Sequence, residues 1–585
     1  DWAKCVLDEH RLHEICDVLF SPSFGQLAPR ELADWIVADA QVLPGADAQH
    51  GAAGYSERVL YLPHTYQPNG RVLWDEMAVL SAPERARARQ AAGLPAQALV
   101  LANFNSPYKT DAQSWDIWMH LLREVPQAVL WLLADHPLAQ ANLRAAAQAA
   151  GVNPARVVLA PKLPRQAHLM RLRLADLALD PLGMGGHTTT SDALRMGLPV
   201  LTVAAGTFGR RVAASLLHAA GMADAVLPDP ASLLAVLRDW ARDEKLRKGL
   251  QMRADLARMT TPLFDPQVFA RDWQTALDAV WQHKLQSDGR RCLDLRAAHA
   301  PAWAKDVAQA LEKPVAAVVQ QAKTWVEADL LPQARALCEA LLQRHPQSAN
   351  GCALLALVHY RQGRHDLAAA LFERAVARLS QPDAQLLHNW ASALESGNHF
   401  EAAEQVYRQA LQAQPDRADT LGQLGCMLRN LGRVDEALVL HQRMLALKPD
   451  DAQSVYIYGG SLYQAGKVDE SMAVLQQALD LNPQLHEARS NLGICHLLKG
   501  AFAQGWEDFE ARWHSPQMKG SWAPFPAPSW AGENLNGQAF LAWAEQGLGD
   551  NIQFVRYLGV LRLRYPQVRL AFWGPKTLFR LIEGF

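Results

Sequence analysis

Apolar and polar positions alternate in blocks between residues 98 and 220. Short runs rich in Val, Leu and Ala are separated by amphipathic stretches of helical length. The runs are ALVLANF (98–104), AVLWLLAD (128–135), RVVLAPKL (156–163), ADLALDPL (175–182) and LPVLTVAA (198–205). Runs that are apolar on both faces are typical of parallel strands covered by helices. The pattern therefore predicts an α/β fold with a parallel sheet.

The predicted sheet also indicates where a ligand binds. Ligands of such sheets bind beyond the carboxyl ends of the strands. We therefore expect the functional edge to consist of the loops that follow Phe104, Leu159, Leu182 and Val203. From Pro230 to Leu285 the pattern is helical throughout, and residues 286–319 are predicted to be a linker that turns helical.

A repeat of 34 residues covers residues 320–515. The recurring sets are Gly432, Gly466 and Gly500; Gly425, Gly459 and Gly493; Pro415, Pro449 and Pro483; and Ala403, Ala437, Ser471 and Gly505. Gly363 and Gly397 extend the first set backwards, with one residue of slippage before Gly432. Small residues where helices touch, Gly in the turn and Pro at the end of each unit are typical of tetratricopeptide repeats. We predict five to six helix pairs in an all-α solenoid, whose concave groove suits protein or peptide partners.

The last segment, residues 516–585, changes pattern again. After a connector rich in Trp, Pro and Gly come a strand pattern (QAFLAWA), a loop (EQGLGD), a helix pattern and a second strand pattern (VRLAFWG). This order predicts the start of a second α/β domain.

Composition and charge exclude several classes of function. The chain has 585 residues and a formal net charge of -2, which gives no basic field for nucleic acid. Its seven cysteines are scattered without metal-ligand spacing, and we expect free thiols, no metal site and a cytoplasmic location. No apolar run approaches the roughly 20 residues that span a bilayer. The chain begins with Asp and stops soon after a strand pattern, so we expect a fragment at both ends.

The densest polar chemistry follows the fourth strand pattern, in GGHTTTSDALRMG. A Gly pair permits close backbone approach, and a Thr or Ser is expected to cap the next helix, whose first turn attracts phosphate. The hydroxyls of Thr188 and Thr189 add donors, His187 contacts a phosphate or sugar oxygen, and Asp192 accepts from ribose hydroxyls. This set suits a nucleotide-sugar diphosphate. The alternative is a well-capped helix with a solvated histidine.

Two other loops on the same edge carry basic residues. Lys109, in NFNSPYKTD after the first strand, is a point charge suited to phosphate. Arg165, His168 and Arg171, after the third strand, are spaced by three and share one helical face. The alternatives are a surface lysine and a solvated basic face. No pair of acids and no Ser/His/Asp spacing indicates a general acid/base couple or a nucleophile.

Several motifs together resemble a known family. GYSERVLYLPHTYQP, FNSPYKTD, PKLPRQAHLMR and LALDPLGMGGHTTTSDALRMGLPVLT are similar to the C-terminal lobe of O-linked N-acetylglucosamine transferases. These are tetratricopeptide-linked GT-B glycosyltransferases of family 41, and the resemblance covers roughly residues 20–284. It implies a Rossmann-like nucleotide-sugar-binding lobe over 51–285 and a remnant of the N-terminal lobe in 1–50.

The resemblance also implies roles for individual residues. Lys109 would hold the diphosphate, and Lys109 and His187 would be the catalytic residues. The uracil and ribose would be surrounded by Leu163, Arg165, His168 and Arg171. The phosphate and sugar would be bound by His187, Thr188 and Thr189, and the ribose by Asp192. The implied reaction is an inverting, metal-independent transfer of N-acetylglucosamine, or a related sugar, from a UDP-sugar to Ser/Thr of proteins, with no cofactor.

Departures from the family keep a second hypothesis open. Ser106 stands where animal members carry Gln, and Arg165 where they carry Lys. The acceptor-side histidine motif is not recognisable, and none of His10, His13, His50 and His64 can be assigned to it. The chain is then a tetratricopeptide scaffold that carries an incomplete, inactive lobe. A weaker resemblance links LAWAEQGLGDNIQFVRYL to heptosyltransferase-like enzymes, with Gly547 and Gly549 near a ligand and Asp550 capping the helix.

Overall fold

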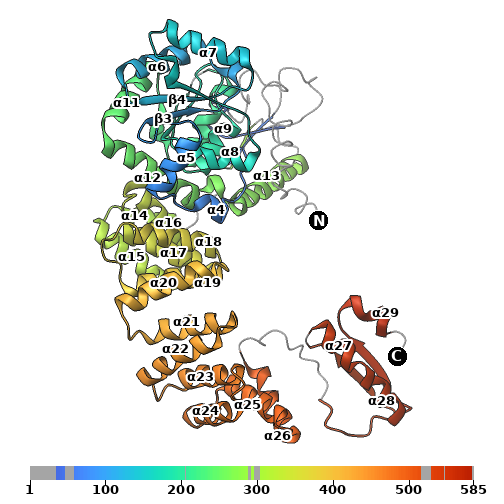
Figure 1. The fold of residues 1–585 in the computed structure, drawn as a ribbon. Coiled ribbons are helices and arrows are strands. Elements are labelled where there is room, and N and C mark those ends of the chain that lie inside the picture. The colour runs from blue at the N-terminus through green and yellow to red at the C-terminus, as the bar shows by residue number, and fades with distance from the viewer. Residues whose placement is uncertain are drawn as a thin grey trace. The chain divides into compact units, whose positions relative to one another are not determined.

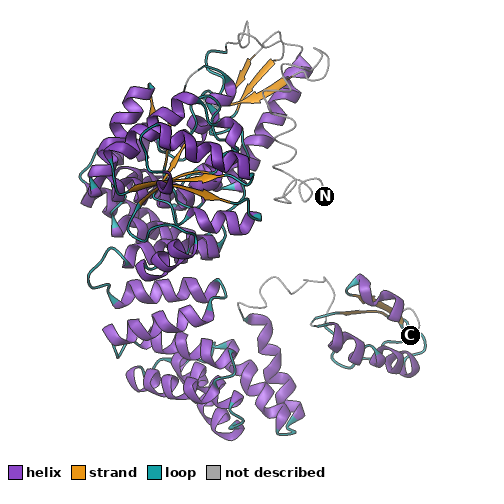
Figure 2. Ribbon diagram, turned by 45° about the horizontal axis from the view of Figure 1, so that its top comes forward, coloured by secondary structure: helices purple, strands orange, loops and turns teal. Residues whose placement is uncertain are grey.

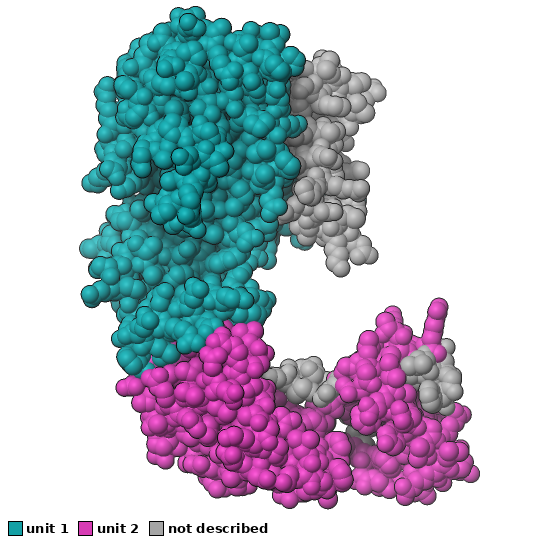
Figure 3. Space-filling view, viewed as in Figure 1, with its two compact units in different colours: residues 1–415 teal, residues 416–585 magenta. Residues whose placement is uncertain are grey.

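The computed structural model describes residues 35–46, 58–204, 206–286, 292–295, 303–515, 529–545 and 547–582. The chain divides into two compact units, residues 1–415 and 416–585 (Figure 3). Most of the predicted N-terminal remnant, with His10, His13 and His50, lies outside the described residues.

The first unit is built around a six-stranded sheet with strand order β5-β4-β3-β6-β7-β8. The strands are β3 (Leu99–Asn103), β4 (Ala128–Leu133), β5 (Val157–Ala160), β6 (Leu177–Leu179), β7 (Val200–Val203) and β8 (Val226–Leu227). All neighbouring pairs are parallel. The five predicted strands are confirmed. Sequence analysis missed β8, because two residues leave no recognisable apolar run.

Helices surround this sheet (Figures 1 and 2). They are α4 (Trp74–Met77), α5 (Ala82–Ala91), α6 (Ala112–Glu124), α7 (Pro137–Ala149), α8 (Arg165–Leu172), α9 (Thr188–Arg195), α10 (Val212–Ala219), α11 (Pro230–Arg242) and α12 (Glu244–Thr260). Helix α6 is an example of how these helices are capped and packed. It begins after Asp111, whose carboxylate accepts from the Ser114 amide at 2.9 Å, and it buries Trp118 and Leu121 against the sheet side.

A smaller parallel sheet lies in the same unit, with strand order β1-β2-β9. Its strands are β1 (Trp35–Ala38), β2 (Arg58–Tyr61) and β9 (Cys292–Asp294), and α13 (Pro266–Gln286) packs on it. Leu60, Leu293 and Ala276 form part of a shared core. The sequence predicts a linker where β9 forms, because its three residues lie among charged residues (RRCLDLR) and not in an apolar run.

The helical repeats begin in the first unit after α14 (Ala304–Leu311). The first three pairs are α15 (Val315–Glu327) with α16 (Leu331–Arg344), α17 (Ala349–Arg361) with α18 (His365–Val376), and α19 (Ala384–Ser396) with α20 (Phe400–Ala413). The second unit contains α21 (Ala418–Asn430) with α22 (Val434–Leu447), α23 (Ala452–Gln464) with α24 (Val468–Leu481), and α25 (His486–Leu498) with α26 (Phe502–Phe509). The described residues therefore hold six pairs, at the upper end of the prediction.

The turn inside each pair has one residue in the left-handed backbone region. These residues are Asp329, Gly363, Asn398, Gly432, Gly466 and Gly500, with φ between 57° and 82°. The predicted register is wrong at one point: Asn398, not Gly397, takes this position. Asn and Asp tolerate positive φ better than other non-glycine residues. The extra residue of the repeat therefore lies before Asn398, in the loop between α18 and α19.

Small residues bring the two helices of each pair together, as predicted. Ala403, Ala437 and Ser471 are fully buried. A Cβ atom added at Gly425 would lie 2.3 Å from His441 Nε2, and one added at Gly493 would lie 2.6 Å from the Phe509 nitrogen. The close approach of these helices therefore requires glycine at both positions.

Buried ion pairs join the α/β lobe to the first repeats. Arg374 of α18 pairs with Asp255 of α12 at 3.0 Å, and Arg258 pairs with the same carboxylate. Arg364 contacts Asp265, just before α13, at 2.8 Å. Within this unit the lobe and the first repeats are therefore fastened by charged contacts.

The end of the second unit contains β10 (Ala539–Trp543), α27 (Leu548–Phe554), α28 (Arg556–Arg564), β11 (Arg569–Trp573) and α29 (Phe579–Ile582). Strands β10 and β11 are parallel, which matches the predicted strand–helix–strand order. Asp550 does not cap α27: Gly547 precedes the helix, and Asp550 lies within its first turn. No helix among the described residues is long and apolar enough to cross a bilayer.

Candidate functional site

The strand order places a crevice at the carboxyl ends of β3 and β6. These two strands are neighbours, and the chain continues outward from β3 on one side and from β6 on the other. Parallel sheets bind ligands where the order reverses in this way. The loop after β3 carries Lys109, and the loop after β6 carries His187, so the sequence prediction that these loops share one edge is confirmed.

A buried carboxylate holds the loop after β6. Asp180 Oδ1 accepts from the Gly186 amide at 2.6 Å, and Oδ2 accepts from the Thr202 hydroxyl at 2.5 Å. Burial raises the pKa of Asp180 to about 6, although these hydrogen bonds and the charge of Lys109 favour the ionised form. Lys109 Nζ donates to the Gly185 carbonyl at 3.1 Å. The loop is therefore fastened from β6, from β7 and from the loop after β3.

Helix α9 begins directly after His187, and no side-chain hydrogen bond caps it. The expected Ser/Thr cap is therefore wrong: Thr188 is the first residue of the helix. Thr189 Oγ1 donates to Asn105 Oδ1 at 2.7 Å, and His187 Nε2 lies 3.3 Å from the Gly209 carbonyl. The first amides of α9 thus face the crevice without a protein cap, which suits an anion.

Glycine is required where this loop meets α9. A Cβ atom at Gly186 would lie 2.6 Å from the hydroxyls of both Thr189 and Thr190. The backbone therefore passes these hydroxyls more closely than any other residue type allows.

The predicted base-side residues cluster on α8. His168 Nδ1 accepts from Arg171 at 2.8 Å, and the His168 ring meets Phe104 edge to face, with centroids 5.5 Å apart. Burial lowers the pKa of His168 to about 4, helped by the nearby charges of Arg171 and Arg165. His168 is thus neutral at pH 7, with Nδ1 as an acceptor and the proton on Nε2.

Arg171 is buried, so the alternative of a solvated face is wrong for this residue. Its guanidinium donates to the Pro161 carbonyl at 2.6 Å and lies 4.2 Å from the centre of the Phe104 ring. It therefore positions His168 and Phe104 rather than facing solvent.

Arg165 and Asp192 form an ion pair that the sequence did not predict. Arg165 donates to Asp192 Oδ1 at 3.2 Å, and the Asp192 side chain is 7% exposed whereas that of Arg165 is 39% exposed. The predicted uracil side and ribose side of the site are thus linked by one contact. Leu163 lies partly exposed in the loop between β5 and α8.

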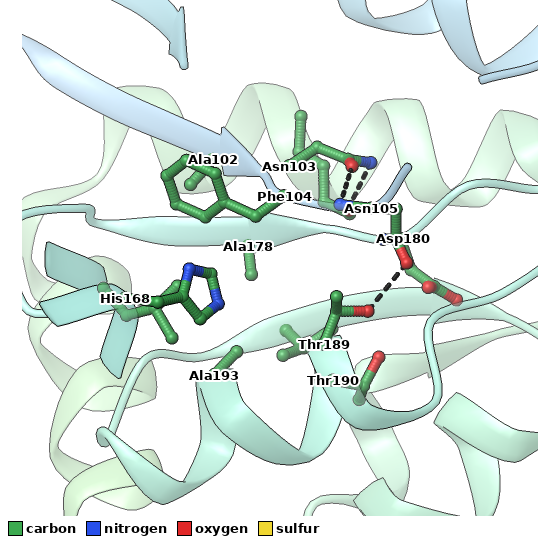
Figure 4. Close-up of a pocket in the computed structure, with 13 residues that line it drawn as sticks. Ala102, Asn103, Phe104, Asn105, His168, Ala178, Asp180, Thr189, Thr190 and Ala193 are labelled. Atoms are coloured by element: carbon green, nitrogen blue, oxygen red, sulfur yellow. Dashed lines mark hydrogen bonds between the residues drawn. The ribbon is translucent and has the colours of Figure 1, made fainter. Parts of the chain in front are cut away.

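A small pocket lies between His168 and Thr189, and no other predicted site residue lines it (Figure 4). Its lining includes Phe104, Asn105, His168, Asp180 and Thr189, and its volume of about 20 Å³ is room for one water molecule. Sequence analysis singled out two of these five, His168 and Thr189. The signal for Asp180 and Asn105 was their place as polar residues directly after apolar strand runs. Nothing in the sequence indicated that Asp180 is buried.

Comparisons with known proteins agree with this arrangement. Residues 81–273 match the family model of glycosyl transferase family 41. Residues 320–384, 385–451 and 459–500 match three models of tetratricopeptide repeats. Fold and repeats therefore define a glycosyltransferase-type α/β lobe linked to a tetratricopeptide solenoid. Over residues 81–273 the lobe is similar to glycosyl transferase family 41.

The match to each relative covers only part of that relative's length. The UDP-N-acetylglucosamine–peptide N-acetylglucosaminyltransferase of Caenorhabditis elegans is 30% identical over 189 residues, which are 32% of this chain and 16% of that protein. The probable enzyme SEC of Arabidopsis thaliana is 30% identical over 254 residues, 42% of this chain and 25% of that protein. The chain thus spans a quarter or less of these relatives. An O-GlcNAc transferase mutant from Thermobaculum terrenum is 24% identical, with a TM-score of 0.37, and covers 43% of this chain and 46% of that one.

Proposed function

We propose that this chain transfers N-acetylglucosamine, or a related sugar, from a UDP-sugar to Ser or Thr hydroxyls of proteins. The observation that carries the proposal is the family 41 match over 81–273, together with the meeting of Lys109, His187 and Thr189 at one sheet edge. The relatives named above are peptide N-acetylglucosaminyltransferases, which supports the donor and the acceptor class.

In this proposal the diphosphate lies over the first turn of α9. The acceptor hydroxyl oxygen attacks the anomeric carbon, and the bond from that carbon to the β-phosphate oxygen breaks. The hydroxyl proton is released to solvent, UDP leaves, and the sugar is bound to the acceptor with inverted configuration. Charge develops on the diphosphate, so Lys109 and the free amides of α9 stabilise the departure. Because they supply positive charge, no metal ion is needed for this role.

The other residues orient the donor. Thr188, Thr189 and His187 donate to phosphate and sugar oxygens, and Asp192 accepts from the ribose while it stays paired with Arg165. Neutral His168 offers Nε2–H to a uracil carbonyl, while Leu163 and Arg171 complete the wall. The donor is a substrate, and the proposal includes no cofactor.

Replacing Lys109 by Ala tests this proposal, with Lys162→Ala as the matched control. Lys162 lies exposed in the loop after β5 on the same edge. We expect Lys109→Ala to lower sugar transfer about 100-fold and to weaken UDP binding in calorimetry, because one charge leaves the diphosphate site. Lys162→Ala is expected to act as wild type. Wild-type protein that binds no UDP contradicts the proposal.

The repeats support a second candidate, a protein-binding scaffold. Tetratricopeptide models match most of residues 320–500, and arrays of this type bind peptides in their concave groove. If the full chain captures protein partners but neither binds UDP nor transfers sugar, the scaffold is its function. If it does both, we propose that the groove presents the acceptor.

We further propose a cytoplasmic location. Cys338, Cys352 and Cys495 are buried free thiols, which suits a reducing compartment. Labelling these thiols in protein taken directly from cells tests this, since oxidised cysteines would contradict it.

A further inference from the structure

A large cavity lies at the amino-terminal edge of the six-stranded sheet, opposite the edge that carries Lys109 and His187. Its volume is about 690 Å³, against about 20 Å³ for the pocket at the other edge. Leu99 at the start of β3, Asp176 before β6 and Leu198 before β7 line it. Helices α5 and α12 contribute other parts of its wall. A cavity of this size is typical of a small-molecule site.

The wall of this amino-edge cavity carries an excess of positive charge. Its basic residues are Arg85, Arg89, Arg173, Arg247, Lys248 and Arg258, and its acidic residues are Asp176, Glu244 and Asp255. Six cations and three anions leave a formal charge of +3. A low-dielectric cavity with such an excess attracts anions.

Two of these cations, Arg173 and Arg247, donate their hydrogen bonds to carbonyls, although Asp255 and Glu373 lie near enough to favour the charge of Arg173. Arg173 donates to the Ala78 carbonyl, and Arg247 donates to the carbonyls of Trp240 and Ala241 at 3.0 and 2.8 Å. Neither forms an ion pair with any other described residue. Arg89 and Arg258, in contrast, are buried and paired with Asp176 and Asp255.

The surroundings of Arg173 disfavour its charge. Burial and the neighbouring charges of Arg258 and Arg374 lower the pKa of Arg173. A bound anion would offset this repulsion, and the planar guanidinium groups of Arg173 and Arg247 match phosphate oxygens.

The floor of the cavity is apolar. Leu172, Leu198 and Trp240 are almost fully buried beneath it, and Met252 is half-buried at its side. This floor suits a ring or short chain, so phosphate alone would leave most of the surface unused.

We propose that the amino-edge cavity binds a phosphorylated small molecule, with its phosphate held by Arg173 and Arg247 and its apolar part against Leu172, Leu198 and Trp240. The site is separate from the proposed UDP-sugar site, and it stands whether or not the chain transfers sugar.

The proposal is tested by calorimetry on the full chain at low salt, with inorganic tripolyphosphate and adenosine monophosphate as probes. We expect both to bind, and the double variant Arg173→Gln/Arg247→Gln to weaken binding about tenfold or more, since two charge-assisted contacts are lost. Arg144→Gln, an exposed arginine on α7, is the matched control and should bind as wild type. Lys109→Ala should leave the part of this binding that depends on Arg173 and Arg247 unchanged.

A double variant that fails to fold, as judged by circular dichroism, is replaced by Arg173→Lys/Arg247→Lys. We expect the lysine variant to retain weakened binding, because charge is kept while the planar fork is lost. The proposal is overturned if wild type binds neither probe, or if Lys109→Ala abolishes binding while the arginine variants do not. It is also overturned if the chain sediments with phosphatidic acid vesicles but binds neither soluble probe, since the ligand would then be a lipid surface.

Discussion

The α/β lobe and the repeat array are stabilised by different means within one chain. In the lobe, buried charged side chains hold loops and helix ends, as Arg195 does with Glu76 at 2.8 Å. In the array, small residues let helices approach, and one left-handed residue turns each pair. Within each unit the array spreads its stability over similar helix pairs that contact one another.

The largest expected effect lies where the two regions meet. Asp255 is enclosed by Arg258 and Arg374, so Asp255→Ala removes the carboxylate that two buried cations share and leaves Arg374 only its pair with Glu373. We expect a loss of about 3–5 kcal/mol in the free energy of unfolding, measured with urea. The control is Asp224→Ala, which removes an ion pair whose carboxylate is 65% exposed and should cost less than about 1 kcal/mol. Equal losses would show that the junction is not held by its charges.

The next effect separates helix packing from helix propensity. Gly425→Ala would place a Cβ 2.3 Å from His441 Nε2, whereas Gly249 in α12 has nothing within 4 Å. We expect Gly425→Ala to cost about 1–3 kcal/mol through overpacking. Gly249→Ala should instead stabilise by up to about 1 kcal/mol, because Ala favours a helix. Thermal unfolding measures both, and two stabilising changes would contradict the packing account.

A pH series tests the buried groups of the lobe. The pKa of Asp180 is raised to about 6 in the folded state, above the pKa of an unfolded Asp. The folded state therefore loses stability relative to the unfolded state as the pH rises from about 4 to 6. The pKa of His168 is lowered to about 4, so its contribution has the opposite sign and is lost as the pH falls from about 6.5 to 4.

The two contributions are separated by comparing each variant with wild type. From pH 4 to 6, wild type should lose stability relative to Asp180→Asn, by at most about 1.4 kcal/mol per pH unit. Over the same range it should gain stability relative to His168→Gln. Urea unfolding at several pH values measures both differences, and parallel curves would exclude the proposed titrations.

The smallest effect concerns the left-handed turn residues. Gly432 has φ +82 and nothing near its Cβ position. Gly432→Val is expected to cost about 1–2 kcal/mol through backbone strain alone. Gly432→Asn should cost less, since Asn398 occupies the equivalent turn. Thermal unfolding of the two variants gives the difference, and identical melting temperatures would mean that the turn tolerates any residue.

Periodicity explains why the two regions were not equally predictable. A 34-residue step repeats over several columns, so the helix pairs follow from the sequence, and the single error placed Gly397 where Asn398 lies. The strands of the central sheet were also predicted, because each is an apolar run between helical stretches. Strand β8 was missed because it has two residues, and β9 because it lies among charged residues.

The site was predictable in place but not in its contacts. Strand order determines which loops meet, and the loop sequences identified Lys109, His187 and His168. Contacts between distant residues, such as Arg165 with Asp192, depend on tertiary packing that no local pattern records. The same holds for Asp180: its role follows from burial between β6 and β7, which appears only once the sheet is assembled.

The loop between α18 and α19 has seven residues, where the other connections between successive repeats have four. Helix α18 is two residues shorter than α16 and α20, so the surplus is one residue, and the following pairs resume the 34-residue step. The extra residue thus moves the later pairs one position along the sequence without changing the spacing between them. An epitope or fluorophore inserted in residues 377–383 should therefore leave both flanking repeats intact, which makes this loop the natural place to label the array.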